Sequence, residues 1–183
     1  VLEVIRAEKL DFKVMLGAHL GAEMNNFGCP WGATYSEEQL QVSVAENEAE
    51  LERLVRLARR YPDIVFSVAV GNEAITAIRG TGIGVKRAIS QPVTFCENYV
   101  PWQFKLRELV AELDFISLHT YPVWEYKHVH DALHYSKDNY HSVAHLYPGK
   151  SVVITEAGWA TSSNGRGIHP ENSSQDLQQI YYE

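Results

Sequence analysis

The stretch that decides the fold is Ile64–Glu73, with the sequence IVFSVAVGNE. Its first part is apolar or small without strict alternation, which is typical of a strand buried on both faces of a parallel sheet. Gly71, Asn72 and Glu73 follow at once, so an amide and a carboxyl group stand at the carboxyl end of this strand. A charged group beside a buried strand is costly unless it is paired, solvated or used. The stretch therefore predicts a parallel sheet and marks one of its ends for function.

Similar apolar stretches predict four more strands, over Lys13–Leu20, Pro92–Cys96, Asp114–Leu118 and Ser151–Thr155. The clearest helix is expected over Glu37–Tyr61, and Pro62 ends it. Ser36 and Gln39 have the spacing of a capping box at its start. Further helices are expected over Val1–Ala7, Gln103–Glu112, Val129–Leu146 and from Asn172 or Ser173 onward. Strands that alternate with helices predict an α/β fold with crossover helices.

Two connections are irregular. Residues Gly21–Tyr35 are expected to form a long loop, and loops of this length are usually functional or mobile. The connection Glu73–Gln91 is short for a full helical crossover, so only a stunted helix is expected there, around Val85–Ile89.

The composition limits the classes of function. The chain has 183 residues, which fits one domain, and its formal net charge is −7. An acidic chain has no general attraction for nucleic acid or an anionic membrane, so an uncharged substrate is expected. No apolar run reaches the roughly 18 residues of a membrane span. Cys29 and Cys96 are the only cysteines, so a disulfide framework is not expected, although one bridge remains possible.

Polar and aromatic side chains follow four of the predicted strands. These strands lead into Asn72-Glu73, Glu97-Asn98-Tyr99, His119-Thr120-Tyr121 and Glu156-Ala157-Gly158-Trp159. In (β/α)8 barrels the carboxyl ends of the strands carry the active site. The pattern therefore predicts that these side chains share one end of the sheet.

Glu73 and Glu156 form a candidate catalytic pair, although they are 83 residues apart in the chain (156 − 73). Hydrolysis of a glycosidic bond needs two carboxyl groups that face one another across a sugar. One is protonated and assists the leaving oxygen, while the other attacks or activates water. Taken singly, each glutamate could equally be a rim charge paired with a lysine or arginine.

The flanking residues carry a family resemblance. Ser67–Glu73 (SVAVGNE), followed by Ile154–Trp159 (ITEAGW), resembles glycoside hydrolase family 17. Pro92–Trp102 (PVTFCENYVPW) and Asp114–Tyr126 (DFISLHTYPVWEY) resemble the bacterial branch of that family. The resemblance implies a (β/α)8 TIM-barrel type chain holding about strands 3 to 7. Residues 1–183 are then expected to be part of a catalytic domain, because five strands cannot close a barrel.

The resemblance also implies an activity. It implies a retaining glycosidase of the endo-β-1,3-glucanase type that acts on β-glucan through a covalent glycosyl-enzyme and needs no cofactor. A β-1,3-glucan transglycosylase remains open, because both reactions pass through one covalent intermediate. Trp31 is a candidate for shaping the acceptor side. The family implies a periplasmic or extracellular location, although the first residues lack the pattern of a signal peptide.

Residue roles follow from the matched motifs. The resemblance implies that Glu73 is the general acid/base and Glu156 the nucleophile, with their carboxyl groups about 5–5.5 Å apart in the complete site. Asn72 would bind the sugar 2-hydroxyl. Glu97 could bind sugar hydroxyls or repel Glu73 and favour its protonated form.

The aromatic and histidine residues have weaker assignments. Tyr121 could orient Glu156 and His119 could line the site, although both could equally be interior residues that satisfy each other. Trp159 is expected to stack on a sugar face. For Trp124, and for Trp102, stacking and simple packing are about equally expected.

Two other classes compete with an enzyme of this kind. A zinc site could use His130 with His134, or His141 with His145, because each pair has i, i+4 spacing on a predicted helix. HEXXH is absent, and a solvated helix face explains these histidines more simply. A non-catalytic carbohydrate-binding protein would use the same aromatic residues, but it has no need of two opposed carboxyl groups.

Overall fold

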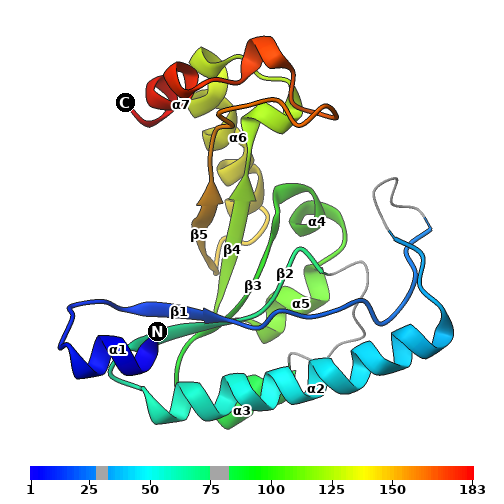
Figure 1. The fold of residues 1–183 in the computed structure, drawn as a ribbon, viewed down its shortest axis with the longest axis vertical. Coiled ribbons are helices and arrows are strands. Elements are labelled where there is room, and N and C mark those ends of the chain that lie inside the picture. The colour runs from blue at the N-terminus through cyan, green and yellow to red at the C-terminus, as the bar shows by residue number, and fades with distance from the viewer. Residues whose placement is uncertain (28–32, 75–82) are drawn as a thin grey trace. The chain divides into compact units, whose positions relative to one another are not determined.

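The computed structural model describes residues 1–27, 33–74 and 83–183. Two compact units make up the chain, and each is described by itself. Unit 1 comprises Val1–Glu97 with Glu108–Ile116, and unit 2 comprises Asn98–Arg107 with Ser117–Glu183. Five strands form one parallel sheet in the order β1-β2-β3-β4-β5 (Figure 1). The predicted α/β fold with a parallel sheet is therefore confirmed.

All five predicted strands are present. Their bounds are β1 Val14–Gly17, β2 Val65–Asn72, β3 Val93–Asn98, β4 Phe115–Thr120 and β5 Ser151–Ala157. The helices of unit 1 are α1 Leu2–Ala7, α2 Glu37–Arg60, α3 Ile83–Ala88 and α5 Arg107–Glu112, whose first residue belongs to unit 2. Unit 2 contains α4 Tyr99–Phe104, α6 Ala132–Ala144, α7 Gln175–Tyr182 and the 3-10 helices η1 Pro122–Glu125, η2 Val129–Asp131 and η3 Pro170–Asn172.

Helix α2 follows the sequence closely. The Ser36 hydroxyl accepts a hydrogen bond from the Gln39 backbone, and the Gln39 side chain accepts one from the Ser36 backbone, which is the predicted capping box. Leu51, Leu54 and Ala58 are buried at helical spacing on one face. The second half of the helix therefore packs on the strands of unit 1 with an apolar stripe.

Three other helix predictions need correction. The helix expected over Gln103–Glu112 is two short helices, because α4 ends at Phe104 and the chain turns to bury Leu106 before α5 begins. The helix expected over Val129–Leu146 begins as η2 and continues as α6. The last helix starts later than expected, because the Ser174 hydroxyl caps α7 by accepting from the Leu177 backbone.

The side chain of Asn47 in α2 holds the start of the predicted long loop. Its Oδ1 accepts from the Gly21 backbone N–H at 2.7 Å, and its Nδ2 donates to the Gly21 carbonyl and to Glu23 Oε1, each at 2.9 Å. Across the loop, the Asn25 side chain makes hydrogen bonds to both the backbone N–H and the carbonyl of Tyr35. Both ends of the loop are therefore pinned. Trp31 and Cys29 lie outside the described residues.

Burial differs between the central and the edge strands. Every residue of β4 except the half-buried Phe115 is buried, whereas Val153 and Ile154 of the edge strand β5 are 45% and 41% exposed. The expectation that all five strands are covered on both faces is therefore wrong for β5 and for β1, which has no fully buried residue. An edge strand lacks a neighbour on one side.

Gly71 fixes the shape of the chain after β2. Its φ of 142° lies in a region that side chains rarely adopt, and a Cβ there would lie 2.5 Å from Cε2 of Phe95 on β3. The next paired residues are Asn72 and Cys96, after a register shift in the β2–β3 ladder. Only glycine fits this turn.

Gly71→Ala should therefore lower the free energy of unfolding by about 2–4 kcal/mol, because a methyl group combines backbone strain with a clash against a buried ring. Denaturant unfolding would measure the change. Gly17→Ala on β1 is the matched control, since no described atom lies within 4 Å of a Cβ there, and it should change stability by less than about 1 kcal/mol. Equal costs for the two variants would contradict this account of Gly71.

Candidate active site

Glu156 is the centre of a polar cluster in unit 2. It lies near the carboxyl end of β5 and its side chain is 43% exposed. The Tyr121 hydroxyl donates to Glu156 Oε1 at 2.5 Å, and His119 Nε2 lies 3.2 Å from Glu156 Oε2. Each carboxyl oxygen therefore faces a different polar group, which fixes the orientation of the carboxyl group.

The partners of Glu156 are held firmly. His119 is the fifth residue of β4 and is 1% exposed, and Tyr121 follows the end of the same strand. Gly158 packs against the Tyr121 ring, because a Cβ at Gly158 would lie 3.1 Å from Tyr121 Cε1. The sequence left open whether Tyr121 and His119 contact Glu156 or only each other, and the structure places both against Glu156.

The strand ends of unit 1 carry the other predicted site residues. Asn72 is the last residue of β2, and both Asn72 and Glu73 are exposed. Glu73 has a φ of 49°, and its backbone N–H donates to the Cys96 carbonyl at 2.9 Å. Glutamate is uncommon in this left-handed conformation, which costs about 1–3 kcal/mol and is found most often at functional sites.

Glu97 lies on β3 of unit 1 and is 5% exposed. A carboxyl group at this depth needs compensation from its surroundings. The structure therefore brings Asn72, Glu73 and Glu97 to the ends of two paired strands in unit 1, and brings His119, Tyr121 and Glu156 together in unit 2.

The expected role of Trp159 is wrong. Its side chain is 3% exposed and packs in a core cluster with Val123, Val129, Ala132 and Ile168. The indole N–H donates to the Asn172 carbonyl, and Tyr181 covers the ring at a centroid distance of 5.7 Å. A buried ring offers no face to a sugar, so Trp159 is a structural residue.

The two weaker stacking candidates differ from each other. Trp102 is fully buried in unit 2, and its indole N–H donates to the Ser117 carbonyl, so it packs the core. Trp124 in η1 is 46% exposed. One edge of its ring packs against Gly167, since a Cβ there would lie 3.0 Å from the ring. Only Trp124 keeps surface for a ligand.

The sequence did not single out a pair of tyrosines in unit 2. The hydroxyl groups of Tyr99, which follows β3, and Tyr135 of α6 lie 2.7 Å apart. Burial raises the pKa of Tyr99, and the hydrogen bond to Tyr135 raises it further. Lys127 Nζ lies 4.8 Å from the centroid of the Tyr135 ring. Tyr99 comes directly after Glu97 and Asn98 at the end of a strand. This position in the sequence was the observation that could have identified it.

The histidines do not form a metal centre in the part of the chain that is described. No group of three or more His, Cys, Asp or Glu able to hold a metal ion occurs there. His130 belongs to η2 rather than to the helix of His134, and His134 pairs with Asp138 at 3.4 Å. His141 and His145 stack on each other on one side of α6.

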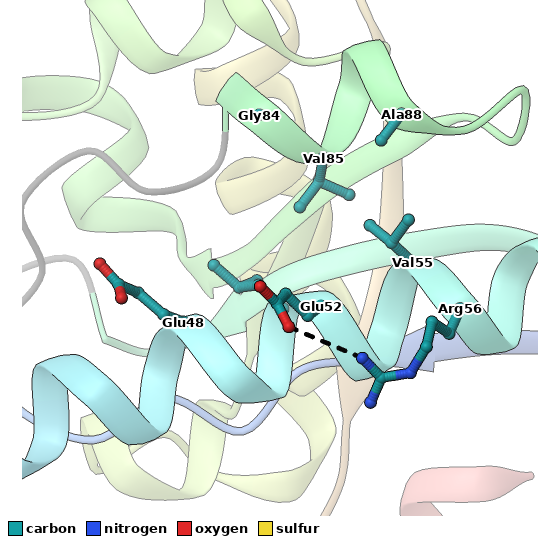
Figure 2. A pocket seen from close by; sticks show the side chains of 8 residues that line it. Glu48, Glu52, Val55, Arg56, Gly84, Val85 and Ala88 are labelled. Atoms are coloured by element: carbon teal, nitrogen blue, oxygen red, sulfur yellow. Dashed lines mark ion pairs between the residues drawn. The ribbon is translucent and has the colours of Figure 1, made fainter.

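The groove between α2 and α3 in unit 1 is not a candidate active site (Figure 2). It measures about 550 Å³, and Leu51, Val55 and Val85 form much of its lining. Its ion pair, between Arg56 and Glu52 at 3.7 Å, is exposed to solvent and contributes little. The groove is formed by the sides of helices, whereas the polar clusters described above stand at strand ends.

Comparisons with known proteins were made by sequence and by structure. No protein-family model matches the chain, and no curated protein sequence matches it.

Among the described residues, no helix has the length and apolar character needed to cross a membrane.

Several solved structures share the fold. An endo-laminarinase from Formosa Hel1_33_131 matches with a TM-score of 0.71 and 22% identity, over 99% of this chain and 60% of the other. A GH113 β-1,4-mannanase matches with a TM-score of 0.62 and 19% identity, over 99% and 60%. An active-site mutant of the Rhizomucor miehei β-1,3-glucanosyltransferase with laminaritriose matches with a TM-score of 0.55 and 15% identity, over 91% and 79%.

These matches confirm the expected fold class, part of a (β/α)8 TIM-barrel type domain. The chain spans 60% of the length of the endo-laminarinase that it resembles. The matching proteins are glycoside hydrolases and a glucanosyltransferase.

Gly158→Ala should lengthen the contact between Tyr121 and Glu156, because the added methyl group pushes the tyrosine ring by a few tenths of an ångström. We expect a loss of about 1–2 kcal/mol in the free energy of unfolding, as for an overpacked core. A crystal structure of the variant would measure the oxygen–oxygen distance. Gly149→Ala in the same unit has no described atom within 4 Å of its new Cβ and should leave the contact intact. An unmoved Tyr121 ring in Gly158→Ala would refute the packing role.

Proposed function

We propose that the protein is a retaining glycoside hydrolase of the endo-β-1,3-glucanase type. The observation that carries the proposal is the carboxylate of Glu156, held at a strand end between the Tyr121 hydroxyl and His119 Nε2. A nucleophilic carboxylate has to be oriented and open on one side. The two polar contacts and the exposure of 43% meet these needs.

In the proposed reaction, Glu156 attacks the anomeric carbon of a glucosyl unit. Glu73 donates its proton to the leaving glycosidic oxygen as the bond to that oxygen breaks. Glu73, now ionised, then takes a proton from water, and the water oxygen attacks the anomeric carbon and displaces Glu156. The configuration at the anomeric carbon is inverted twice and therefore retained.

The residues of unit 1 have supporting roles in this proposal. Asn72, next to Glu73, would donate a hydrogen bond to the sugar 2-hydroxyl, an interaction that strengthens in the transition state. Glu97 is 5% exposed, so of its two expected roles we propose the indirect one, in which it favours the protonated form of Glu73 rather than binding a sugar hydroxyl. The left-handed backbone of Glu73 supports a functional role, because such conformations cluster at active sites.

A β-glucan substrate is supported by several observations. The endo-laminarinase and the glucanosyltransferase with laminaritriose share the fold, and a further Rhizomucor miehei structure of this kind is described as family 17. The SVAVGNE and ITEAGW stretches resemble that family. The formal charge of −7 suits an uncharged polysaccharide. We propose a periplasmic or extracellular location on the resemblance.

Transglycosylation is the second candidate, favoured by the match to a glucanosyltransferase. A sugar hydroxyl then replaces water in the second step and gives a new glycosidic bond. Incubation with laminari-oligosaccharides of one length distinguishes the two reactions. Products longer than the donor indicate transfer, whereas only shorter products indicate hydrolysis.

Glu156→Gln should reduce turnover of laminarin by several orders of magnitude, because the amide is a poor nucleophile, while binding of oligosaccharide persists. Reducing-end release and calorimetric titration would measure the two effects. Asp138→Asn, which neutralises an exposed carboxyl group on α6, is the control and should leave turnover unchanged. Full activity in Glu156→Gln would exclude this residue as nucleophile. Oligosaccharide binding with no turnover in the unaltered protein would instead favour a non-catalytic carbohydrate-binding protein.

Tyr121→Phe should lower kcat by about 10–150-fold, because a hydrogen bond to a charged group contributes about 1.5–3 kcal/mol. The phenyl ring still packs on Gly158, so the free energy of unfolding should change little. Tyr147→Phe removes a hydroxyl that donates to the Trp102 carbonyl in the same unit, and it should affect stability but not kcat. Equal effects of both variants on kcat would show that Tyr121 has no special role.

A further inference from the structure

Unit 2 contains a hollow of about 440 Å³ that the proposed catalytic residues do not line. Its lining residues are Tyr126, Lys127, His128, His169, Glu171 and Asn172. Its volume falls within the roughly 300–1,000 Å³ typical of small-ligand sites.

The hollow is built by the two chain segments that leave the carboxyl ends of β4 and β5. The segment after β4 contains η1 and η2, and the segment after β5 contains η3 (Figure 1). The Asn172 side-chain amide donates to the Lys127 carbonyl at 2.8 Å and joins the two segments. These are the strands that carry His119 and Glu156, so the hollow lies in segments that continue from the Glu156 cluster.

Tyr126 supplies the aromatic surface. Its side chain is 65% exposed, and its ring meets the His169 ring edge-on, with centroids 5.4 Å apart. Its φ of 55° is left-handed, a conformation that is cheaper for glycine or asparagine than for tyrosine. The Lys127 backbone N–H donates to the Pro122 carbonyl and closes this turn. The fold therefore presents a tyrosine ring to solvent at an energetic cost.

The polar groups around Tyr126 include both donors and acceptors. His128 and His169 supply ring nitrogens and Glu171 supplies carboxyl oxygens, and His169 Nδ1 lies 3.5 Å from Glu171 Oε1. The Lys127 ammonium group lies over the Tyr135 ring, which does not line the hollow. A flat ring beside donors and acceptors fits an uncharged ligand with many hydroxyl groups and an apolar C–H face, which is a pyranose.

We propose that this hollow binds one glucosyl unit of a β-glucan chain, as a subsite separate from the Glu156 cluster, with the sugar stacked on Tyr126. The inference rests on the proposed function, since it takes the same polysaccharide as ligand. His128, His169 and Glu171 bind the sugar hydroxyls. A long chain gains affinity from this subsite, whereas a chain too short to reach it does not.

The test uses the Glu156→Gln protein, in which the ligand stays intact, and laminarihexaose as the probe. Tyr126→Asn removes the ring and suits the left-handed backbone. It should weaken laminarihexaose binding by about 2–12-fold, the effect of one lost stacking contact. Tyr126→Phe should bind as tightly as the parent. Phe104→Ala removes a ring that is 74% exposed elsewhere in unit 2 and should change nothing.

Histidine ring signals in NMR spectra give a second readout that does not depend on activity. Laminarihexaose should shift the signals of His128 and His169, which line the hollow, but not that of His134, which lies outside it. Unchanged affinity in Tyr126→Asn, or binding that leaves His128 and His169 unshifted, would overturn the inference. If the unaltered protein still cleaves laminarin in that case, the proposed function stands and only the subsite is lost. If laminarihexaose neither binds nor is cleaved, both proposals fall together.

Discussion

The contact between the Tyr121 hydroxyl and Glu156 is the interaction on which the polar cluster of unit 2 depends. It joins two residues that are far apart in sequence, because β4 and β5 are neighbours in the sheet. His119 approaches the other carboxyl oxygen from within β4, and Gly158 makes room for the Tyr121 ring. In the proposed reaction, a carboxylate fixed on two sides and open on the third would lose little orientational freedom on attack, which is how a rigid scaffold lowers a barrier.

Unit 1 has its own constrained backbone, at the end of β2. The Phe95 ring occupies the space that a Cβ on Gly71 would need, so the chain leaves β2 in a conformation reserved for glycine. Two residues later Glu73 also has a positive φ, while its backbone N–H still bonds to the Cys96 carbonyl of β3. The cost of this strained turn is offset by the buried strands beneath it, of which β2 and β3 are the best covered in unit 1.

The sequence predicts local secondary structure well, but it predicts poorly which residues are buried by parts of the chain that are distant in sequence. The strands are found because their apolar runs are local, and the cap of α2 because Ser36 and Gln39 are three residues apart. The break between α4 and α5 is missed because the burial of Leu106 depends on tertiary packing, which no periodicity reveals. The positive φ of Glu73 is missed because nothing in its own side chain requires it. The polar strand ends were predicted from position alone, while the choice between the two interpretations of Tyr121 and His119 needed the structure.

Trp159 shows how a residue of a recognisable motif can pack the core instead of standing at the surface. Its position just after Glu156 suggested a sugar platform, but its ring fills the core of unit 2 and its indole N–H holds the Asn172 carbonyl. Asn172 in turn holds the Lys127 carbonyl through its side chain, and Lys127 is the neighbour of Tyr126. A chain of direct contacts therefore runs from the strand that carries Glu156 to the turn that exposes a tyrosine ring. In this arrangement the buried aromatic residue supplies rigidity, and the exposed one is the ring that the proposed subsite would use for stacking.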